Sequence, residues 1–283
     1  MEAIRRGMRI FSDEQRARID YLSWAARHCI GSDKGCPGCG SASAELIRHK
    51  YLVTSLWECP TCHLRFRVPK ETPQRAEELY REERYRQGFT TTLPSREELS
   101  RLLEIRFAGT EKDYLRYITV LQSVLPGGAR ILDFGSSWGY GSWQMSQAGF
   151  EVLSFEVGRQ RSHYAQEFLG CQMIEDLRAV EGKMDCFFSA HVIEHLPDPN
   201  IVFREAAKVL VPGGYFVCFC PNGSPNREKM DPNYHKLWGK VHPLHITAEF
   251  MLWACERYGF ALYEGSGGNA TAEELLIVAR NTV

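Results

Sequence analysis

Two cysteine pairs have the spacing of a metal site. Cys36 and Cys39 form a first Cys-x-x-Cys pair, and Cys59 and Cys62 form a second pair nineteen residues later. Four thiolates presented by two tight turns are soft ligands that can close a tetrahedral zinc site. Because protein side chains would fill all four positions, such a zinc would be structural. The alternatives are a redox pair and ordinary core cysteines.

A second group of residues surrounds a glycine-rich turn. An apolar run at 131–134 is followed by small residues and by a helical stretch that ends near residue 148, and a second apolar run, 152–155, ends at Glu156. This order predicts a strand, a turn, a helix and a strand. Glycines let the backbone approach a ligand closely, and a carboxylate after the second strand can accept two hydrogen bonds from a ribose diol. A purely structural strand-to-helix turn is the alternative.

The acid before this turn narrows the choice of nucleotide. Asp133 would repel a pyrophosphate, but it tolerates a ligand that carries an amino group and a sulfonium charge. Asp133, Gly135 and Gly139 match the acid-x-Gly-x-Gly-x-Gly motif of class I S-adenosylmethionine-dependent methyltransferases, with Ser137 in place of the middle glycine. The chain resembles this family over about residues 111–283. The resemblance implies a Rossmann-like seven-stranded sheet and S-adenosylmethionine bound by Asp133, Gly135, Ser136, Ser137, Gly139 and Glu156.

The same resemblance assigns residues after two later strands. Asp176 follows the expected third strand, where the family commonly places an acid against the adenine amino group, although a solvated turn acid is the alternative. After the expected fourth strand, the run from His191 to Pro199 is similar to a family signature of Glu-His followed by Asp-Pro. It implies that Ala190 and His191 lie under the methionine part of the cofactor.

Histidines supply candidates for proton transfer. A loop of the length of 221–247 inside a compact domain usually has a function, and its segment around His242 and His245 resembles one in bacterial enzymes that methylate sugars or natural products. Histidine suits the deprotonation of an alcohol, so His191, His242 and His245 are the candidate bases.

A metal on His242 and His245 is the competing interpretation. It is disfavoured because cation-dependent methyltransferases use carboxylates and this segment has none. Carbon and nitrogen acceptors remain open.

The elements that must position these residues alternate along the chain. Helices are expected at 12–30, 72–85, 95–107, 111–125, 159–169, 201–210 and 248–258. Strands are expected at 46–57, 64–68, 131–134, 152–155, 171–174, 185–190, 215–220, 260–264 and 274–279. Alternation with nearly unbroken apolar strands predicts an α/β fold whose parallel sheet is covered on both faces. The cysteine turns resemble zinc-ribbon knuckles, which predicts a helical and zinc-ribbon module at 1–110 and a methyltransferase domain at 111–283.

The composition excludes some classes of partner. The chain has 34 basic and 35 acidic residues, and residues 1–120 carry only a mild net charge of +4. Nothing in this balance indicates binding to nucleic acid or to an anionic membrane. No apolar run approaches the ~20 residues of a membrane helix, and the first residues lack a signal-peptide core. Cysteines in a metal pattern and in apolar strands indicate a reduced, cytoplasmic protein.

Three functions follow, in order of preference. The first is methyl transfer, with O-methylation of a small molecule such as a sugar or natural product. The second is an RNA methyltransferase that grips its substrate with the zinc ribbon. It predicts a basic stripe and an Asn/Asp-Pro-Pro-aromatic signature after the fourth strand, where residues 190–193 instead read Ala-His-Val-Ile. The third is a non-catalytic scaffold, against which the retained motif residues argue. The oligomeric state does not follow from the sequence.

Overall fold

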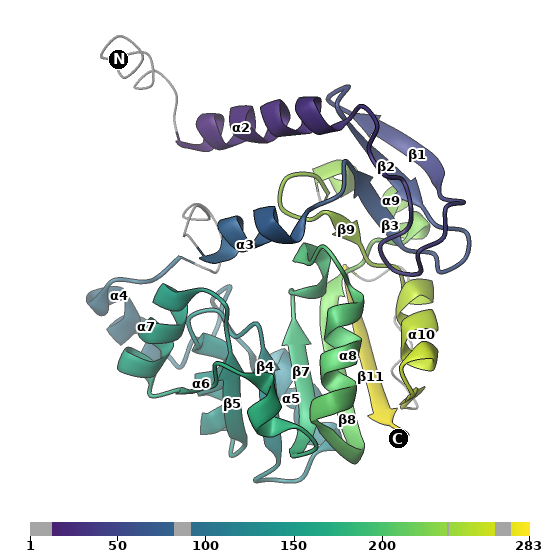
Figure 1. The fold of residues 1–283 in the computed structure, drawn as a ribbon. Helices are drawn as coiled ribbons and strands as arrows, with labels where there is room; N and C mark the ends of the chain where they lie inside the picture. Colours follow the sequence, from purple (N-terminus) through teal and green to yellow (C-terminus); the bar gives the residue numbers. More distant parts are fainter. Residues whose placement is uncertain (1–12, 82–91, 237, 264–272) are drawn as a thin grey trace.

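The computed structural model describes residues 13–81, 92–236, 238–263 and 273–283, and it contains two sheets (Figure 1). The larger has seven strands in the order β10-β11-β8-β7-β4-β5-β6. The predicted α/β fold with a mostly parallel seven-stranded sheet is confirmed. Its strands are β4 (Arg130–Phe134), β5 (Glu151–Phe155), β6 (Gln172–Met173), β7 (Met184–Ala190), β8 (Leu210–Pro221), β10 (Phe260–Leu262) and β11 (Glu274–Asn281).

The strand order creates a switch point beside β4. The chain runs from β4 to β5 and β6 on one side, and then returns to place β7 and β8 on the other side. These five strands are parallel, whereas β11 pairs antiparallel with β8 and with β10. Ligands of open parallel sheets bind at the carboxyl ends of the strands beside such a switch point. The ends of β4 and β7 are therefore the place to look for a site.

Helices cover both faces of this sheet, and each central strand presents apolar residues to both faces. Ile131 of β4 packs with one core and the next residue, Leu132, packs with the other. Such two-sided burial is typical of parallel sheets. One face is covered by α5 (Leu115–Val124), α6 (Tyr140–Gln147) and α7 (Arg159–Leu169), and the other by α8 (Asn200–Val209) and α10 (Ala248–Arg257).

A second, four-stranded sheet has the order β1-β2-β3-β9. The first three strands are β1 (Glu45–Lys50), β2 (Thr54–Glu58) and β3 (Arg65–Val68), and β9 (Leu244–His245) comes from the long loop after β8. The expected strand at 46–57 is instead a hairpin. Its turn is tight because Tyr51 and Leu52 adopt left-handed backbone angles, with φ of 56° and 61°.

The two sheets share one hydrophobic core. Phe66 of β3 and three of the four cysteines belong to the same buried cluster as Phe250 and Met251 of α10. Figure 1 shows β9 beside β3 and above the ends of the large sheet. The boundary between residues 110 and 111 therefore stays a prediction, because packing does not separate the two modules.

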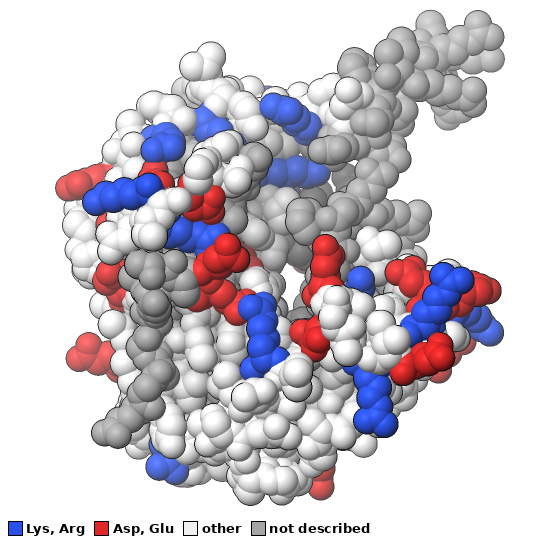
Figure 2. All heavy atoms as spheres, turned by 180° about the vertical axis from the view of Figure 1, so that it is seen from behind, with Lys and Arg blue, Asp and Glu red and all other residues white. Residues whose placement is uncertain are grey.

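Three further helices come from the N-terminal part of the chain, and α9 (Pro225–Met230) comes from the loop after β8. The three are α2 (Asp13–His28), α3 (Pro73–Arg81) and α4 (Arg96–Glu104), and residues 82–85 of the expected second helix lie outside the described residues. In the described part of the chain, no helix is both long and apolar enough to cross a membrane. Figure 2 shows basic and acidic side chains interspersed on one face of the molecule, without a basic stripe among the described residues of that view.

Candidate active site and metal centre

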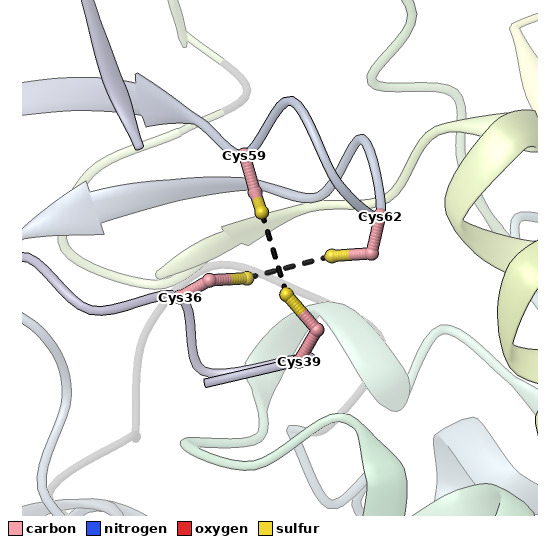
Figure 3. Close-up of side chains that lie close together, drawn as sticks. All are labelled: Cys36, Cys39, Cys59 and Cys62. Carbon is pink, nitrogen blue, oxygen red and sulfur yellow. Dashed lines mark hydrogen bonds between the residues drawn. The ribbon is translucent and has the colours of Figure 1, made fainter. Parts of the chain in front are cut away.

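The four predicted zinc ligands converge on one point (Figure 3). The Sγ atoms of Cys36 and Cys62 are 3.5 Å apart, and those of Cys39 and Cys59 are 3.4 Å apart. These separations are far longer than a disulfide bond of about 2.05 Å. They are close to the ~3.8 Å between sulfurs that a Zn–S distance of about 2.3 Å gives in a tetrahedron. The cluster therefore fits a structural zinc ion.

The turn geometry favours thiolate at Cys36. The backbone N–H of Gly38 donates to Sγ of Cys36 at 3.3 Å, and Sγ of Cys62 lies 3.5 Å from the same sulfur. The contact with Cys62 and the backbone amides of the turn together lower the pKa of Cys36 to about 6, although burial opposes the shift. A thiolate is the form that binds zinc. The first knuckle also contacts the large domain, because Asn200 Nδ2 donates to the Gly38 carbonyl at 2.9 Å.

A cavity of about 1320 Å³ opens at the carboxyl ends of β4, β5 and β7. Its floor is formed by the turn after β4 and by residues 190–196, and its walls include the start of α5 and residues 238–242. Side chains of α2 and β1 complete it. Pockets for a single small molecule usually measure about 300–1,000 Å³, so this cavity has room for a cofactor and an acceptor together.

The glycine-rich turn fits a bound nucleotide. Gly135 has φ of +87°, and a Cβ there would lie 2.4 Å from Cγ2 of Val192, so only glycine is accommodated. Ser137 also has a left-handed φ of 53° and lines the cavity. The hydroxyl oxygens of Ser136 and Ser137 are buried without a hydrogen-bond partner in the described structure. Buried polar atoms without partners commonly mark a missing ligand or water.

Glu156 lies beside this turn and lines the cavity. One oxygen accepts from the Ser137 N–H at 3.0 Å, and the other accepts from the Gly158 N–H at 2.6 Å and from Arg161 at 2.8 Å. A carboxylate offers about four acceptor positions. Three are used, so a ribose hydroxyl has one position available, and a second bond requires a shift of Arg161.

Four of the predicted cofactor contacts lie outside the residues that line the cavity, namely Asp133, Ser136, Gly139 and Asp176. Asp133 is 2% exposed and accepts from the Ser142 hydroxyl at 2.6 Å. Burial raises its pKa to about 7, and the charge of Glu156 adds to this rise. Asp176 is exposed and pairs with Arg178 at 2.6 Å. A cofactor role for any of the four stays a prediction.

His191 follows β7 and lines the cavity together with Ala190. Its Nε2 lies 2.6 Å from Oε1 of Glu274, and its Nδ1 lies 3.4 Å from Oε1 of Glu194. Burial favours the neutral ring, but the two carboxylates outweigh it and raise the pKa of His191 to about 10. Its backbone has a left-handed φ of 56°, an unusual angle for a residue with a side chain. Such strain often accompanies functional positions.

The histidines of the long loop lie in different places. His242 lines the cavity, with its ring centroid 4.6 Å from that of His195. His245 is buried and lies outside the cavity lining, with Nδ1 3.1 Å from the Tyr234 hydroxyl. The structure thus brings His191 and His242 to one cavity and gives His245 a different environment. The three base assignments remain predictions.

Comparison with known proteins decides the family. A model described as a methyltransferase domain matches residues 78–264, about two thirds of the chain. The chain belongs to this methyltransferase family. The predicted class of S-adenosylmethionine-dependent methyltransferases is thereby confirmed.

Two curated relatives of this methyltransferase are similar over a shorter stretch. A ubiquinone biosynthesis O-methyltransferase of Xanthomonas axonopodis pv. citri (strain 306) is 31% identical over 110 residues, which cover 35% of this chain and 46% of the relative. One of Xanthomonas campestris pv. campestris (strain B100) is 32% identical over 111 residues, which cover 36% and 46%. The chain thus spans about half the length of the curated relatives that it matches.

A solved structure supports the fold of the methyltransferase. It is a chain from the complex between the Haloferax volcanii Trm112 methyltransferase activator and a methyltransferase, with a TM-score of 0.51 and 14% identity. The match covers 67% of this chain and 98% of that one. At this identity the likeness concerns the fold alone.

Several residues of the methyltransferase cavity did not emerge from the sequence as cofactor contacts or bases. Arg161, Glu194 and His195 lie in the cavity wall, and Glu274 contacts His191 from the far end of the chain. Glu194 and His195 belong to the sequence motif at 191–199, in which only His191 was assigned a role. Glu274 carried no such signal, because its contact with His191 spans 83 residues.

Cofactor affinity should depend on Glu156. We expect Glu156→Ala to weaken binding of S-adenosylhomocysteine by about 1.5–3 kcal/mol, because hydrogen bonds to a charged group are lost. Isothermal titration calorimetry measures the change. Glu151→Ala, at the opposite end of β5 and exposed, is the matched control and should bind normally. Unchanged affinity in Glu156→Ala would mean that the carboxylate does not contact the ribose.

Proposed function

We propose that the protein transfers a methyl group from S-adenosylmethionine to a hydroxyl group of a small molecule. The observation that carries this proposal is the single cavity that joins the glycine-rich turn and Glu156 to His191 and His242. The cofactor is assigned to the part lined by Gly135, Ser137 and Glu156. The acceptor is assigned to the part near His242. The O-methyltransferase relatives support transfer to oxygen.

The N-terminal module supports the acceptor side of the cavity. Lys50 of β1 donates from Nζ to the carbonyls of His235 and Trp238, at 2.7 and 2.6 Å. Arg67 of β3 donates to the Gly239 carbonyl at 2.5 Å. These bonds attach the ribbon sheet to the loop that carries His242. We infer that the zinc-ribbon module shapes the acceptor pocket.

Aromatic and basic side chains give the acceptor part its character. Tyr21, Tyr51 and Trp238 line it, together with Arg18 and Lys50. Aromatic faces suit flat or sugar-like ligands, and cations favour an acceptor that carries or develops negative charge. A hydroxylated small molecule with an acidic hydroxyl or an anionic group meets both conditions.

The cofactor supplies a methyl group that its sulfonium charge already activates. The protein then has to align the acceptor oxygen with the methyl carbon and remove the hydroxyl proton. In the proposed reaction a C–O bond forms as the C–S bond breaks, with its electron pair left on sulfur. The Nε2–H of His191 donates to Glu274 and Nδ1 faces Glu194, so the ring can take up the hydroxyl proton only in its deprotonated form.

A screen with labelled cofactor tests this function. The protein is incubated with S-adenosylmethionine labelled in the methyl group and with hydroxylated aromatics, nucleotide-sugars, glycosides and total RNA. We expect label in a small hydroxylated acceptor, and less label with Glu156→Ala at low cofactor concentration. Label in RNA alone, or cofactor binding without transfer to any small molecule, would contradict the proposal. Cytoplasmic localisation stays part of the proposal, and it fits the ten cysteines, none of which forms a disulfide bond.

A further inference from the structure

A second group of metal-ligand side chains lies in the wall of the cavity. Glu194, His195 and His242 each present one ligand atom, and these three atoms lie within 4.8 Å of one another. Glu194 and His195 come from the short 3-10 helix Ile193–His195 after β7. His242 comes from the loop before β9. All three line the cavity at the carboxyl ends of the strands.

The carboxylate of this group is buried, and its polar neighbours are histidines. Glu194 is 2% exposed, and neither of its side-chain oxygens has a hydrogen-bond partner in the described structure. Its nearest ionisable neighbours are Nδ1 of His191 at 3.4 Å and Nε2 of His195 at 3.8 Å. Burying a carboxylate is costly unless cations compensate it, and a bound metal ion would add direct ligand contacts to the ion pair with His191.

The orientation of His195 is that of a metal ligand. Its Nδ1 lies 3.0 Å from the Val241 carbonyl oxygen, which can only accept, so Nδ1 carries the proton. In the neutral ring Nε2 therefore presents a lone pair toward Glu194. Histidines that bind metals usually donate their other N–H to a carbonyl or carboxylate in this way.

We propose that Glu194, His195 and His242 bind a divalent transition-metal ion, of the class of Mn²⁺, Fe²⁺, Co²⁺ or Zn²⁺. Two imidazoles and one carboxylate suit these ions better than Mg²⁺ or Ca²⁺, which prefer oxygen ligands. Three protein ligands leave coordination positions open, as in catalytic rather than structural sites.

The open positions indicate the class of acceptor. This step rests on the proposed function. An acceptor with two neighbouring oxygens, such as a vicinal diol, a diphenol or a hydroxy acid, would chelate the ion through both. Metal coordination lowers the pKa of a bound hydroxyl and so prepares it to attack a methyl group.

The carboxylate of this group is distant from His242 in the sequence. The segment that contains His242 and His245 has no carboxylate of its own. In the structure, His242 instead meets His195 and Glu194, which supplies the carboxylate from a different element. His242 thus has a carboxylate near it in space, although its own segment of the sequence contains none.

Manganese binding tests the proposal without an acceptor. Mn²⁺ is added to the zinc-loaded full-length protein and free Mn²⁺ is measured by electron paramagnetic resonance, because Mn²⁺ competes poorly for four thiolates. We expect one bound Mn²⁺ per chain. Loss of an outer-sphere partner typically costs about 10–100-fold in metal affinity, so Glu194→Gln and His242→Ala should each weaken binding at least 100-fold. His235→Ala, in the same loop but outside the group, should bind as wild type does.

The outcomes separate this proposal from the proposed function. Failure of the wild-type protein to bind Mn²⁺, Co²⁺ or a second Zn²⁺ would overturn the metal site even if methyl transfer occurs. Wild-type affinity in Glu194→Gln would overturn it as well, and S-adenosylhomocysteine binding checks that each variant is folded. If a variant does not fold, the wild-type stoichiometry still decides. Metal binding without methyl transfer would support the metal site and contradict the proposed methyltransferase activity.

Discussion

Replacing Cys36 with serine should release the zinc ion and destabilise the whole protein. Structural zinc in small zinc-finger peptides binds with apparent free energies of about 10–16 kcal/mol, which is comparable with the total stability of a typical protein. The cysteines belong to the core that contains Phe250 and Met251 of α10, so the loss should reach beyond the N-terminal module. Elemental analysis should give one equivalent of tightly bound zinc in the wild type and none in Cys36→Ser.

The matched control for this prediction is Cys29→Ser. Cys29 is near the cluster in sequence but outside it, and its thiol contacts the Ala26 carbonyl. This variant should keep zinc and its melting temperature. Thermal unfolding of Cys36→Ser should occur at a lower temperature, with α10 and the ribbon affected together. A metal-free wild-type protein of unchanged stability would refute the zinc assignment and favour a redox role.

Loss of zinc should also lower activity. The ribbon sheet contains β9, and Lys50 and Arg67 attach it to the loop that carries His242. Loosening this sheet therefore displaces a wall of the acceptor pocket while the glycine-rich turn stays in place. We expect folded Cys36→Ser protein to lose more affinity for the acceptor than for S-adenosylhomocysteine.

Replacing His191 with alanine should lower the rate of methyl transfer by about 10²–10⁴-fold, the usual contribution of a positioned general base. His191 lies in the cavity, and Glu274 fixes its ring through the contact at 2.6 Å. Single-turnover kinetics at saturating cofactor measures the effect. Affinity for S-adenosylhomocysteine should stay within a few-fold of wild type, whereas a residue that only supports the cofactor would lose affinity.

Glu274→Gln tests whether the Glu274 carboxylate raises the pKa of His191. A base must be deprotonated before it can accept a proton, so the rate rises with pH through the pKa of the base. A neighbouring carboxylate raises that pKa, and removing its charge lowers it. The rising limb of the pH–rate profile should therefore move to lower pH in Glu274→Gln than in wild type. A limb that does not move would show that Glu274 has no part in the proton transfer.

The other two histidines provide the comparison. His245→Ala should reduce stability rather than the rate of folded enzyme, because this ring is buried and contacts the Tyr234 hydroxyl. His242→Ala should reduce the rate through the proposed metal site. If alanine at each of the three positions leaves methyl transfer within a few-fold of wild type, histidine is not the base.

The local patterns of the sequence were enough to predict the framework. The two Cys-x-x-Cys turns and the run from Asp133 to Glu156 are short-range signals, because neighbouring residues in a tight turn determine where their own side chains and amides point. The alternation of apolar strands and helices likewise predicted the parallel sheet. The cysteine cluster and the glycine-rich turn each depend on contacts within about 30 residues.

Only the tertiary structure decided which distant residues meet. Glu194 comes together with His242, and His191 with Glu274, across separations that no local period encodes. His242 and His245 are three residues apart, yet only His242 lines the cavity. The reason is that β9 pairs with β3 of the ribbon, which holds His245 against Tyr234 and leaves the preceding loop at the cavity. Long-range strand pairing, rather than residue type, therefore determined the composition of the site.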